Sequence, residues 1–348
     1  MPDTSGRPRR ARTLPVLLLV VATVVGLSAA CGTTTPVAGS PGASTVAAEA
    51  GAFPVTIAHK YGDTTIERAP TRVVTVGLTD QDSVVALGTT PVGTTEWFGN
   101  HPGALWPWAA RASTGPVPQV VGDASAIGFE KVAALQPDLI LAVYSGLTQG
   151  DFDKLRQLAP TVAPPSGYVD YGVPWDQQTL TIGKALGQTT KAESLVKDVK
   201  AKFAAATAAN PRFAGATGLV ASRYSDSVAV YAPEDARGRL MSALGFVQPP
   251  EIAQLAGTEF SATISGERLD LLDADALVWI VNDKAADVPK YEADPIYSQM
   301  PVHKERHDVF VENLSELGGG LSFATVLSIP LVLDQLVPQL ATAVQGGA

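Results

Sequence analysis

The chain has 348 residues, of which 46% are hydrophobic and 17% charged, and its formal net charge at pH 7 is −9. An acidic chain of this kind argues against nucleic acid as a partner, and it offers no basic patch for anionic lipids. Cys31 is the single cysteine, so no disulfide can hold the fold and no thiol is left for catalysis.

The first thirty residues have the pattern of a secretory signal peptide. Arginines from Arg7 to Arg12 precede an apolar run from Leu14 to Leu27, which is shorter than the about 20 residues that a membrane-spanning helix needs. Small residues then lead into Cys31 in an arrangement that resembles a bacterial lipobox, whose cysteine is lipidated. We expect residues 1–30 to be removed and the mature protein to be extracytoplasmic and lipid-anchored to the cell membrane.

The chain next passes from a tether into an α/β domain. Residues 31–52 are rich in Thr, Ser, Pro, Gly and Ala and contain no aromatic residue, which predicts a flexible tether. Residues 53–174 alternate short apolar runs with helical segments, a pattern typical of an α/β lobe. The expected elements include a hairpin turning at Gly62, a buried strand at 72–77 and a helix with Asp80 as its N-cap.

Residues 96–109 (EWFGNHPGALWPWA) form an aromatic segment that we expect to be a loop, because its prolines and glycines disfavour a helix or a central strand. The segment follows a strand, and ligands of α/β folds bind in the loops beyond the carboxyl ends of strands. We expect Trp97 and Phe98 to face a ligand, and Trp106 and Trp108 to pack within the protein.

One pattern occurs twice. Residues 127–144 (IGFEKVAALQPDLILAVY) and residues 264–281 (ISGERLDLLDADALVWIV) each hold a glutamate, an aspartate eight residues later and then an apolar run. A helix leading into a buried strand is the unit of a parallel α/β sheet. The two copies predict two lobes built on one plan, with chance similarity between two ordinary units as the alternative.

A long helical region at residues 175–211 separates the two copies. Its segment KAESLVKDVKAKFAAATAAN carries apolar residues at helical spacing. A helix of about 20 residues is about 30 Å long, enough to join two lobes as a stiff strut. Residues 212–348 form the second lobe, in which a strand ends at Arg223 and Tyr224 and a Gly-rich turn at 318–320 precedes the closing helix. The predicted fold is α/β, with two Rossmann-like lobes, one long backbone helix and a ligand cleft between the lobes.

Patterns of catalysis and of metal binding are missing from the sequence. The four histidines are scattered, and His303 and His307 lie four residues apart without a third ligand nearby. The G-x-S-x-G motif and a recognisable nucleophile–base set are absent. The sequence predicts a binding protein rather than an enzyme, with no protein metal site.

Taken in order, the lipobox, RVVTVG, GFEKVAALQPDLIL, the long helix and GERLDLLDADALV resemble the ferric-siderophore substrate-binding lipoproteins of ABC importers. The TEWFG and WPWA segments resemble actinobacterial members in particular. The resemblance covers residues 53–343. It implies two lobes joined by a helix, a ferric siderophore held in the cleft, no intrinsic cofactor, and delivery to a permease of the cytoplasmic membrane. It also implies that Glu130 and Glu267, one on each lobe, dock onto that permease. The alternative is that each glutamate only complements the N-terminus of its helix. We expect a monomer.

Ligand contacts are expected in the loops that follow the strands. Aromatic rings suit large organic ligands, and Arg223 suits an anionic complex, with a surface ion pair as the alternative. The expected contacts are Trp97, Phe98, Tyr144, Tyr168, Tyr171, Arg223, Tyr224, Tyr231 and Phe323. Haem in the same cleft, with Tyr144, Tyr168 or Tyr224 as axial ligand, is an alternative. A cell-surface hydrolase and a tethered protein that binds protein partners are two further alternatives.

Overall fold

The structure is a computed structural model that describes residues 46–224 and 227–346, without the side chain of Glu267. The predicted signal peptide at 1–30 and the predicted lipidation of Cys31 lie outside the described residues. The last residues of the predicted tether are held in place, because the Glu49 carboxylate accepts the backbone N–H groups of Thr190 and Lys191 at the start of helix α6. The first N–H groups of a helix have no partner within it, so Glu49 caps α6 from 141 residues away in the sequence.

The N-terminal half is built on a six-stranded sheet of order β6-β5-β4-β3-β7-β8. Neighbouring strands from β5 to β8 pair parallel, and β5 and β6 pair antiparallel. The strands are β3 (Val73–Thr75), β4 (Gly93–Glu96), β5 (Gln119–Asp123), β6 (Ala126–Ile127), β7 (Leu139–Leu141) and β8 (Thr161–Val162). The hairpin predicted at Gly62 is present as β1 (Val55–His59) and β2 (Gly62–Ile66).

The C-terminal half is built on a second, five-stranded sheet of order β11-β10-β9-β12-β13. β9, β12 and β13 are parallel, whereas β9, β10 and β11 form an antiparallel meander. The strands are β9 (Gly218–Tyr224), β10 (Ser227–Tyr231), β11 (Ser261–Ser265), β12 (Ala276–Val281) and β13 (Asp308–Glu312).

Helices cover both sheets. The N-terminal half holds α1 (Asp80–Ala86), η1 (Pro102–Ala104), α2 (Pro107–Ala112), α3 (Phe129–Ala134) and α4 (Gln149–Leu155). The helical region after it consists of α5 (Trp175–Ala185), α6 (Thr189–Ala209) and the short η2 (Pro211–Phe213). The C-terminal half holds α7 (Ala236–Ala243), α8 (Pro250–Ala256), η3 (Gly266–Leu272), α9 (Lys284–Ala293), η4 (Tyr297–Gln299), α10 (Pro301–Lys304), α11 (Glu316–Phe323) and α12 (Ser328–Ala343).

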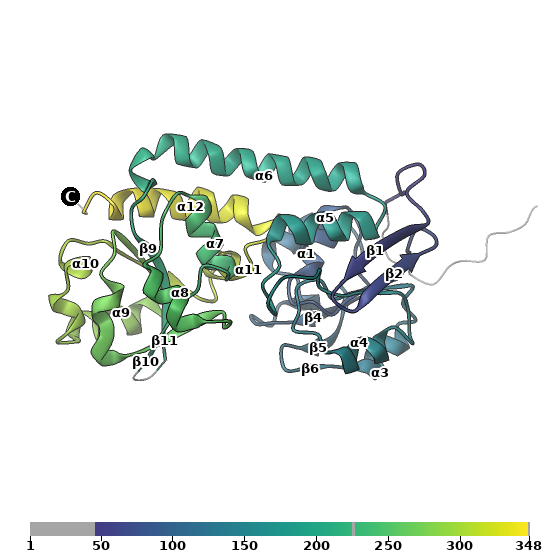
Figure 1. Cartoon of the computed structure of the whole chain (residues 1–348), viewed down its shortest axis with the longest axis horizontal. Helices are drawn as coiled ribbons and strands as arrows, with labels where there is room; N and C mark the ends of the chain where they lie inside the picture. Colours follow the sequence, from purple (N-terminus) through teal and green to yellow (C-terminus); the bar gives the residue numbers. More distant parts are fainter. Residues whose placement is uncertain (1–45, 225–226, 347–348) are drawn as a thin grey trace, which may run out of the picture. The chain divides into compact units, whose positions relative to one another are not determined.

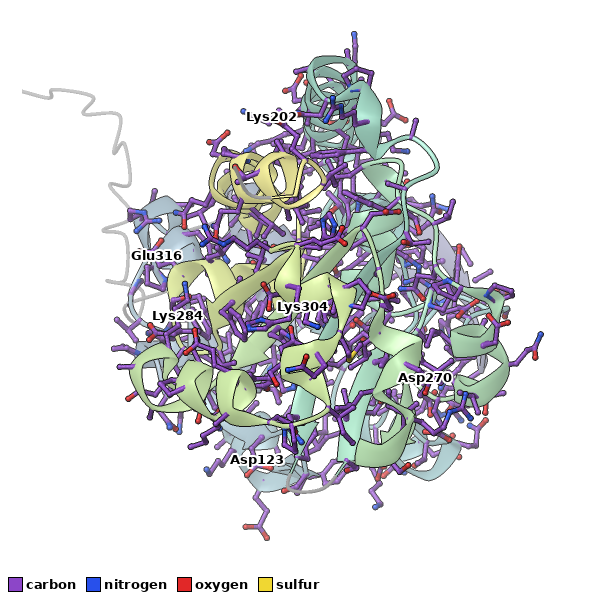
Figure 2. All side chains as sticks on the ribbon, turned by 90° about the vertical axis from the view of Figure 1, so that its left-hand side faces the viewer. Asp123, Lys202, Asp270, Lys284, Lys304 and Glu316 are labelled. Atoms are coloured by element: carbon purple, nitrogen blue, oxygen red, sulfur yellow. The ribbon has the colours of Figure 1, made fainter. Side chains whose placement is uncertain are left out.

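Helix α6 is the predicted long helix, and it belongs to the cores of both halves. Ala192, near its start, is buried with the apolar residues of the N-terminal sheet. Val199 and Phe203, two turns further on, are buried with those of the C-terminal sheet. Figure 1 shows α6 running beside α5 and then beside α12. Its other face is polar, and Lys202 projects into solvent from it (Figure 2).

The two aspartates of the sequence repeat, Asp138 and Asp275, make equivalent hydrogen bonds in the two sheets. The Asp138 carboxylate, just before β7, accepts the N–H groups of Thr71 and Arg72 and the Thr71 hydroxyl, just before β3. The Asp275 carboxylate, just before β12, accepts the N–H and hydroxyl groups of Thr217, just before β9. In each sheet the aspartate therefore fixes the start of the neighbouring parallel strand and so its register.

Four local features differ from the expectations. Thr79, not Asp80, is the N-cap of α1, and Asp80 instead accepts the backbone N–H groups of Val143 and Tyr144 beyond β7. The aromatic segment is not helix-free, because α2 begins within it at Pro107. Proline is tolerated there since the first helical N–H has no partner within the helix.

The Gly-rich residues 318–320 lie within α11 and do not form a turn. A Cβ on Gly318 would come 2.0 Å from the carbonyl oxygen of Glu312, and one on Gly319 would come 2.3 Å from the Trp106 ring. Glycine is therefore required by close packing at these positions and not by a left-handed backbone. The helix predicted around Glu267 is the 3-10 helix η3 rather than an α-helix like α3.

Within the described residues, no single helix is long and apolar enough to cross a membrane; α11 and α12 meet that criterion only as a pair bent by 117°.

Candidate ligand-binding site

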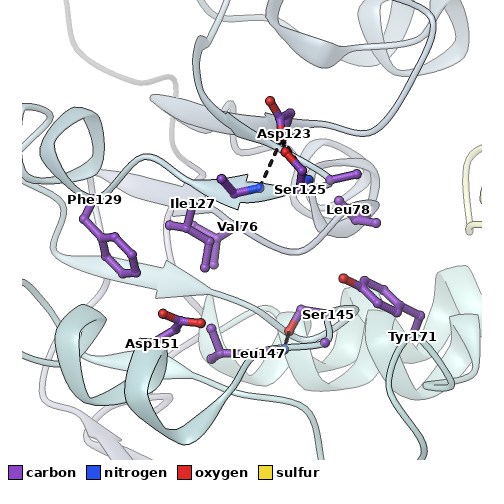
Figure 3. A pocket seen from close by; sticks show the side chains of 13 residues that line it. Val76, Leu78, Asp123, Ser125, Ile127, Phe129, Ser145, Leu147, Asp151 and Tyr171 are labelled. Atoms are coloured by element: carbon purple, nitrogen blue, oxygen red, sulfur yellow. Dashed lines mark hydrogen bonds between the residues drawn. The ribbon is translucent and has the colours of Figure 1, made fainter.

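The N-terminal sheet carries a hollow of about 330 Å³ at the carboxyl ends of its strands. Its walls come from the segments after β3, β5 and β7 and from the loop before α5. Figure 3 shows the Tyr171 ring at one end of the hollow and Phe129 and Asp151 at the other. Asp123 also lines it and accepts the backbone N–H groups that follow β5. None of the residues that line this hollow is basic.

Tyr144 connects this hollow to the C-terminal half. Its ring centroid lies 6.1 Å from that of Tyr171, and both tyrosines follow strands of the N-terminal sheet. Burial, together with the Asp235 carboxylate, raises the pKa of Tyr144, so its hydroxyl is neutral at pH 7 and can donate a hydrogen bond.

Two arginines at the start of α7 face these tyrosines. Arg237 is buried, forms a bidentate pair with Asp235 at 2.7 and 2.9 Å, and stacks with its guanidinium carbon 3.3 Å from the Tyr231 ring centroid. Burial would lower the pKa of Arg237, but the Asp235 carboxylate raises it above the ordinary value, so the cation is retained. The Tyr231 hydroxyl lies 3.0 Å from the hydroxyl of Ser222 on β9, which fixes the ring on this face of the sheet.

Arg239 spans the two halves. Its guanidinium donates a 2.6 Å hydrogen bond to the carbonyl oxygen of Gly172, the residue after Tyr171. No carboxylate pairs with it directly among the described residues, and burial lowers its pKa. Residues of both halves, among them Tyr144 and Arg239, line a pocket of only about 10 Å³, so the halves are in contact here. We call Tyr144, Tyr171, Tyr231, Arg237 and Arg239 the tyrosine–arginine site.

Arg223 is not part of this site. Neighbouring residues of a strand point to opposite faces of the sheet. Ser222 therefore faces Tyr231, whereas Arg223 faces the other side. There it pairs with Asp294 at 2.7 Å and lies over the ring of Tyr291, with its guanidinium carbon 5.7 Å from the centroid. It lines a separate hollow of about 450 Å³ on the C-terminal half. These interactions agree with the alternative reading of the sequence, in which Arg223 forms an ion pair and does not bind the ligand.

The structure does not bring Trp97 and Arg223 to one pocket. Trp97 and Phe98 are half-buried and pack with Phe323 of α11, at centroid distances of 5.3 and 5.7 Å. Trp106 and Trp108 complete the cluster; both are buried and stack at 5.1 Å, in agreement with their predicted packing role. The aromatic segment thus receives Phe323 from the other half of the chain.

Three of the remaining predicted site residues, Tyr168, Tyr224 and Glu130, lie at the surface. Tyr168 and Tyr224 are exposed by 37% and 61%. Glu130 is exposed on the first turn of α3. Glu267 lies in η3, and its side chain is outside the described part of the structure.

The sequence reasoning missed Arg237 and Arg239. A signal was present, because the segment EDARGR places two arginines and two acids directly after the β10 strand. Within the described residues, no group of three or more His, Cys, Asp or Glu side chains could hold a metal ion.

Comparison with known proteins identifies the family. The family model described as "Periplasmic binding protein" matches residues 73–311, which is more than half of the chain. The chain belongs to the periplasmic binding protein family. This assignment confirms the predicted two-lobed α/β fold, and we refer to the two halves as lobes. Proteins of this family bind solutes outside the cytoplasm and do not convert them, in agreement with the prediction of a non-enzyme.

Individual members are similar over most of their length. A periplasmic solute binding protein of Mycobacterium smegmatis is 35% identical, with a TM-score of 0.74, covering 83% of this chain and 98% of the other. The ferric enterobactin-binding periplasmic protein FepB of Escherichia coli O6:H1 is 26% identical, covering 72% of this chain and 86% of its own. The Fe(3+) dicitrate-binding periplasmic protein FecB of Escherichia coli K12 is 24% identical, covering 75% and 83%.

Proposed function

We propose that this periplasmic binding protein captures a ferric siderophore and delivers it to an ABC permease of the cytoplasmic membrane. Two curated relatives with matches over most of the chain are named for ferric complexes, which supports this ligand class. The observation that carries the proposal for this chain is the tyrosine–arginine site between the lobes. Guanidinium groups and phenol hydroxyls donate hydrogen bonds to chelator oxygens, and the rings offer flat apolar faces.

The proposed ligand contacts differ in part from those predicted from sequence. We assign direct contact to the tyrosine–arginine site, with Tyr168 and Tyr224 at its exposed edge. Trp97, Phe98 and Phe323 form a packed wall behind it. Haem ligated by Tyr144 is disfavoured, because burial raises the pKa of that hydroxyl and opposes the tyrosinate form that binds haem iron.

A fluorescence titration tests the proposal. The mature protein should change its tryptophan emission when a ferric siderophore from a panel of hydroxamates, catecholates and carboxylates is added at micromolar concentration, and iron-free chelators should bind more weakly. Arg239→Gln should weaken binding by about tenfold or more, since a charge-assisted hydrogen bond is lost. Arg212→Gln, an exposed arginine of η2, is the matched control. Absence of binding by every ferric complex would contradict the proposal.

Permease docking through Glu130 and Glu267 is a second part of the proposal. It is supported by the position of each residue at the start of equivalent repeats. Glu130→Gln and Glu267→Gln should each lower transport of a bound ferric complex in cells while the affinity for that complex stays the same. Glu193→Gln, an exposed change on α6, should leave transport intact. Unchanged transport in the double variant would exclude this docking role.

The lipid anchor is the third part, and it rests on the LSAAC sequence alone. Cys31→Ser should move the protein from the membrane fraction to the soluble fraction, because the acyl chains attached to the cysteine would be lost. Cell fractionation followed by immunoblotting measures this. A variant that stays with the membrane in high salt would contradict the lipidation of Cys31.

A further inference from the structure

Asp80, the first residue of α1, holds the backbone of the loop that carries Tyr144. Its carboxylate is buried and accepts the N–H groups of Val143 and Tyr144 at 2.7 and 3.0 Å. The carbonyl oxygen of Tyr144 in turn accepts the N–H group of Leu78 at 3.0 Å. The backbone position of Tyr144 therefore depends on a side chain outside the tyrosine–arginine site.

The same carboxylate also bonds to a second segment. The side-chain amide nitrogen of Gln178, a buried residue of α5, donates to Asp80 at 2.8 Å and to the Thr79 hydroxyl at 2.9 Å. Helix α5 begins shortly after Tyr171, so it continues the segment that carries this tyrosine. Asp80 thus connects the loop after β7 with the segment of Tyr171.

These two segments form one wall of the hollow in the N-terminal lobe. Ser145 and Gly146 line the hollow from the loop after β7, and Tyr171 lines it from the other segment (Figure 3). The two are in close contact, because a Cβ on Gly146 would come 2.9 Å from the Tyr171 ring. The spacing between the segments therefore sets the position of the Tyr171 ring in the hollow.

Gly77 provides the space that the Asp80 carboxylate occupies. A Cβ on Gly77 would lie 2.2 Å from Oδ2 of Asp80, the oxygen that accepts the Val143 N–H group. Any larger residue at position 77 would displace the carboxylate from its partners. The backbone at Gly77, the carboxylate and the two segments are therefore fitted to one another.

We propose that Asp80 is a positioning residue for ligand binding, which fixes Tyr144 and Tyr171 at the spacing that the ligand needs by bonding to both segments at once. This inference rests on the proposed function and adds a buried residue that does not touch the ligand. A site whose groups are already ordered binds more tightly, because less conformational freedom is lost on binding. Asp80 contributes in this way to affinity as well as to folding.

Asp80→Asn tests the proposal with an almost unchanged side-chain shape. An amide has one acceptor oxygen where a carboxylate has two, so one of the two backbone N–H groups loses its partner in either orientation of the amide. The probes are a ferric hydroxamate, a ferric catecholate and ferric citrate, titrated by tryptophan fluorescence. The variant should bind the complex preferred by the unaltered protein about fivefold more weakly or worse.

Thr64→Val is the matched control, because it also removes buried hydrogen bonds of the N-terminal lobe. Thr64 on β2 bonds to the His59 ring and to the carbonyl oxygen of Thr161. The variant should be less stable in denaturant unfolding, and its affinity should change by less than about twofold.

A double-mutant cycle with Tyr171→Ala separates positioning from a general loss of stability. Once the Tyr171 ring is absent, Asp80→Asn should weaken binding by about twofold at most, since the group that it positions is gone. Gln178→Leu breaks only the connection to α5 and should weaken binding by about threefold. This variant decides the question if Asp80→Asn does not fold.

Three results would overturn the inference while leaving the proposed function intact. They are an affinity of Asp80→Asn within about twofold of the unaltered protein, an equal loss of affinity with and without the Tyr171 ring, and an unchanged affinity of Gln178→Leu. If the unaltered protein binds none of the three ferric complexes, the proposed function and this inference fail together.

Discussion

Asp82 is a buried ionisable residue at the interface between the lobes. Its carboxylate is fully buried on α1 and accepts hydrogen bonds from the Trp108 indole of the same lobe and from the Thr325 hydroxyl of the other lobe. Both bonds go to one oxygen, and the second oxygen has no partner in the described structure. Burial raises the pKa of Asp82 to about 6, because these two bonds do not compensate for the lost hydration.

This burial predicts a stability that depends on pH. In the unfolded chain Asp82 loses its proton near pH 4, whereas in the folded protein it keeps the proton until about pH 6. The folded state therefore binds more protons between these values, and its stability decreases as the pH rises through this range, by about 3 kcal/mol in total. Asp82→Asn cannot titrate, so the variant should gain stability relative to the unaltered protein between pH 4 and pH 7.5.

Denaturant unfolding at pH 4 and at pH 7.5 measures the difference in the free energy of unfolding between Asp82→Asn and the unaltered protein. Asp198→Asn, an exposed change on α6, serves as control for the loss of one negative charge. The explanation fails if the free-energy difference between Asp82→Asn and the unaltered protein is the same at pH 4 and pH 7.5.

At the scale of elements, the aspartates of the sequence repeat, Asp138 and Asp275, hold neighbouring strands together. Each one links the segment before a buried strand to the start of the neighbouring parallel strand, so that one side chain aligns two strands that lie more than fifty residues apart in the sequence. The two links differ in strength: Asp138 accepts bonds from three groups, whereas Asp275 accepts bonds from two and is exposed.

Replacing these aspartates should destabilise the two lobes unequally. Asp138→Ala should cost about 2–3 kcal/mol and Asp275→Ala about 1–2 kcal/mol, since hydrogen bonds to charged acceptors are lost and backbone N–H groups are left without partners. Thermal and denaturant unfolding measure both values. Asp270→Ala, which removes an exposed pair with Arg268 in η3, should change stability little. A cost for Asp275→Ala that exceeds the cost for Asp138→Ala would contradict this ranking.

At the scale of the whole molecule, the lobes are joined by more than α6. Phe323 of α11 inserts among the tryptophans of the aromatic segment, and Thr325 bonds to Asp82 just beyond it. At the exposed edge of the same contact, Arg111 of α2 pairs with Glu316 of α11 through two hydrogen bonds. These contacts join the two lobes between which the tyrosine–arginine site lies.

Phe323→Ala should weaken this junction. Removing a buried phenylalanine ring costs about 3–5 kcal/mol, and here it also takes away ring contacts with Trp97, Trp106 and Trp108. The native emission spectrum should therefore shift to the red as water approaches the indoles. Phe213→Ala, equally buried but packed against Phe246 within one lobe, should cost stability without that shift. An unchanged emission spectrum for Phe323→Ala would show that the ring does not shield the tryptophans.

The amino-acid sequence by itself determined the elements and their plan. Continuous apolar runs produced the buried strands β7 and β12, helical spacing produced α6, and the spaced glutamate and aspartate marked two equivalent units. These signals are local, because each depends on residues within one or two turns or along one strand. For the same reason, reasoning from local pattern wrongly predicted a turn at residues 318–320. Glycine is required there because the Glu312 carbonyl oxygen and the Trp106 ring leave no room for a Cβ, and not because of the backbone conformation.

Only the tertiary structure decided which side chains meet at the site. Successive side chains of β9 point to opposite faces of the sheet, so Arg223 and Tyr224 must lie on different faces. The sequence of the strand does not determine which of these faces is turned toward the other lobe. Arg239 reaches Gly172 across 67 residues, and Asp82 meets Thr325 across 243. Contacts between residues so far apart depend on how whole elements pack, and no local pattern encodes them.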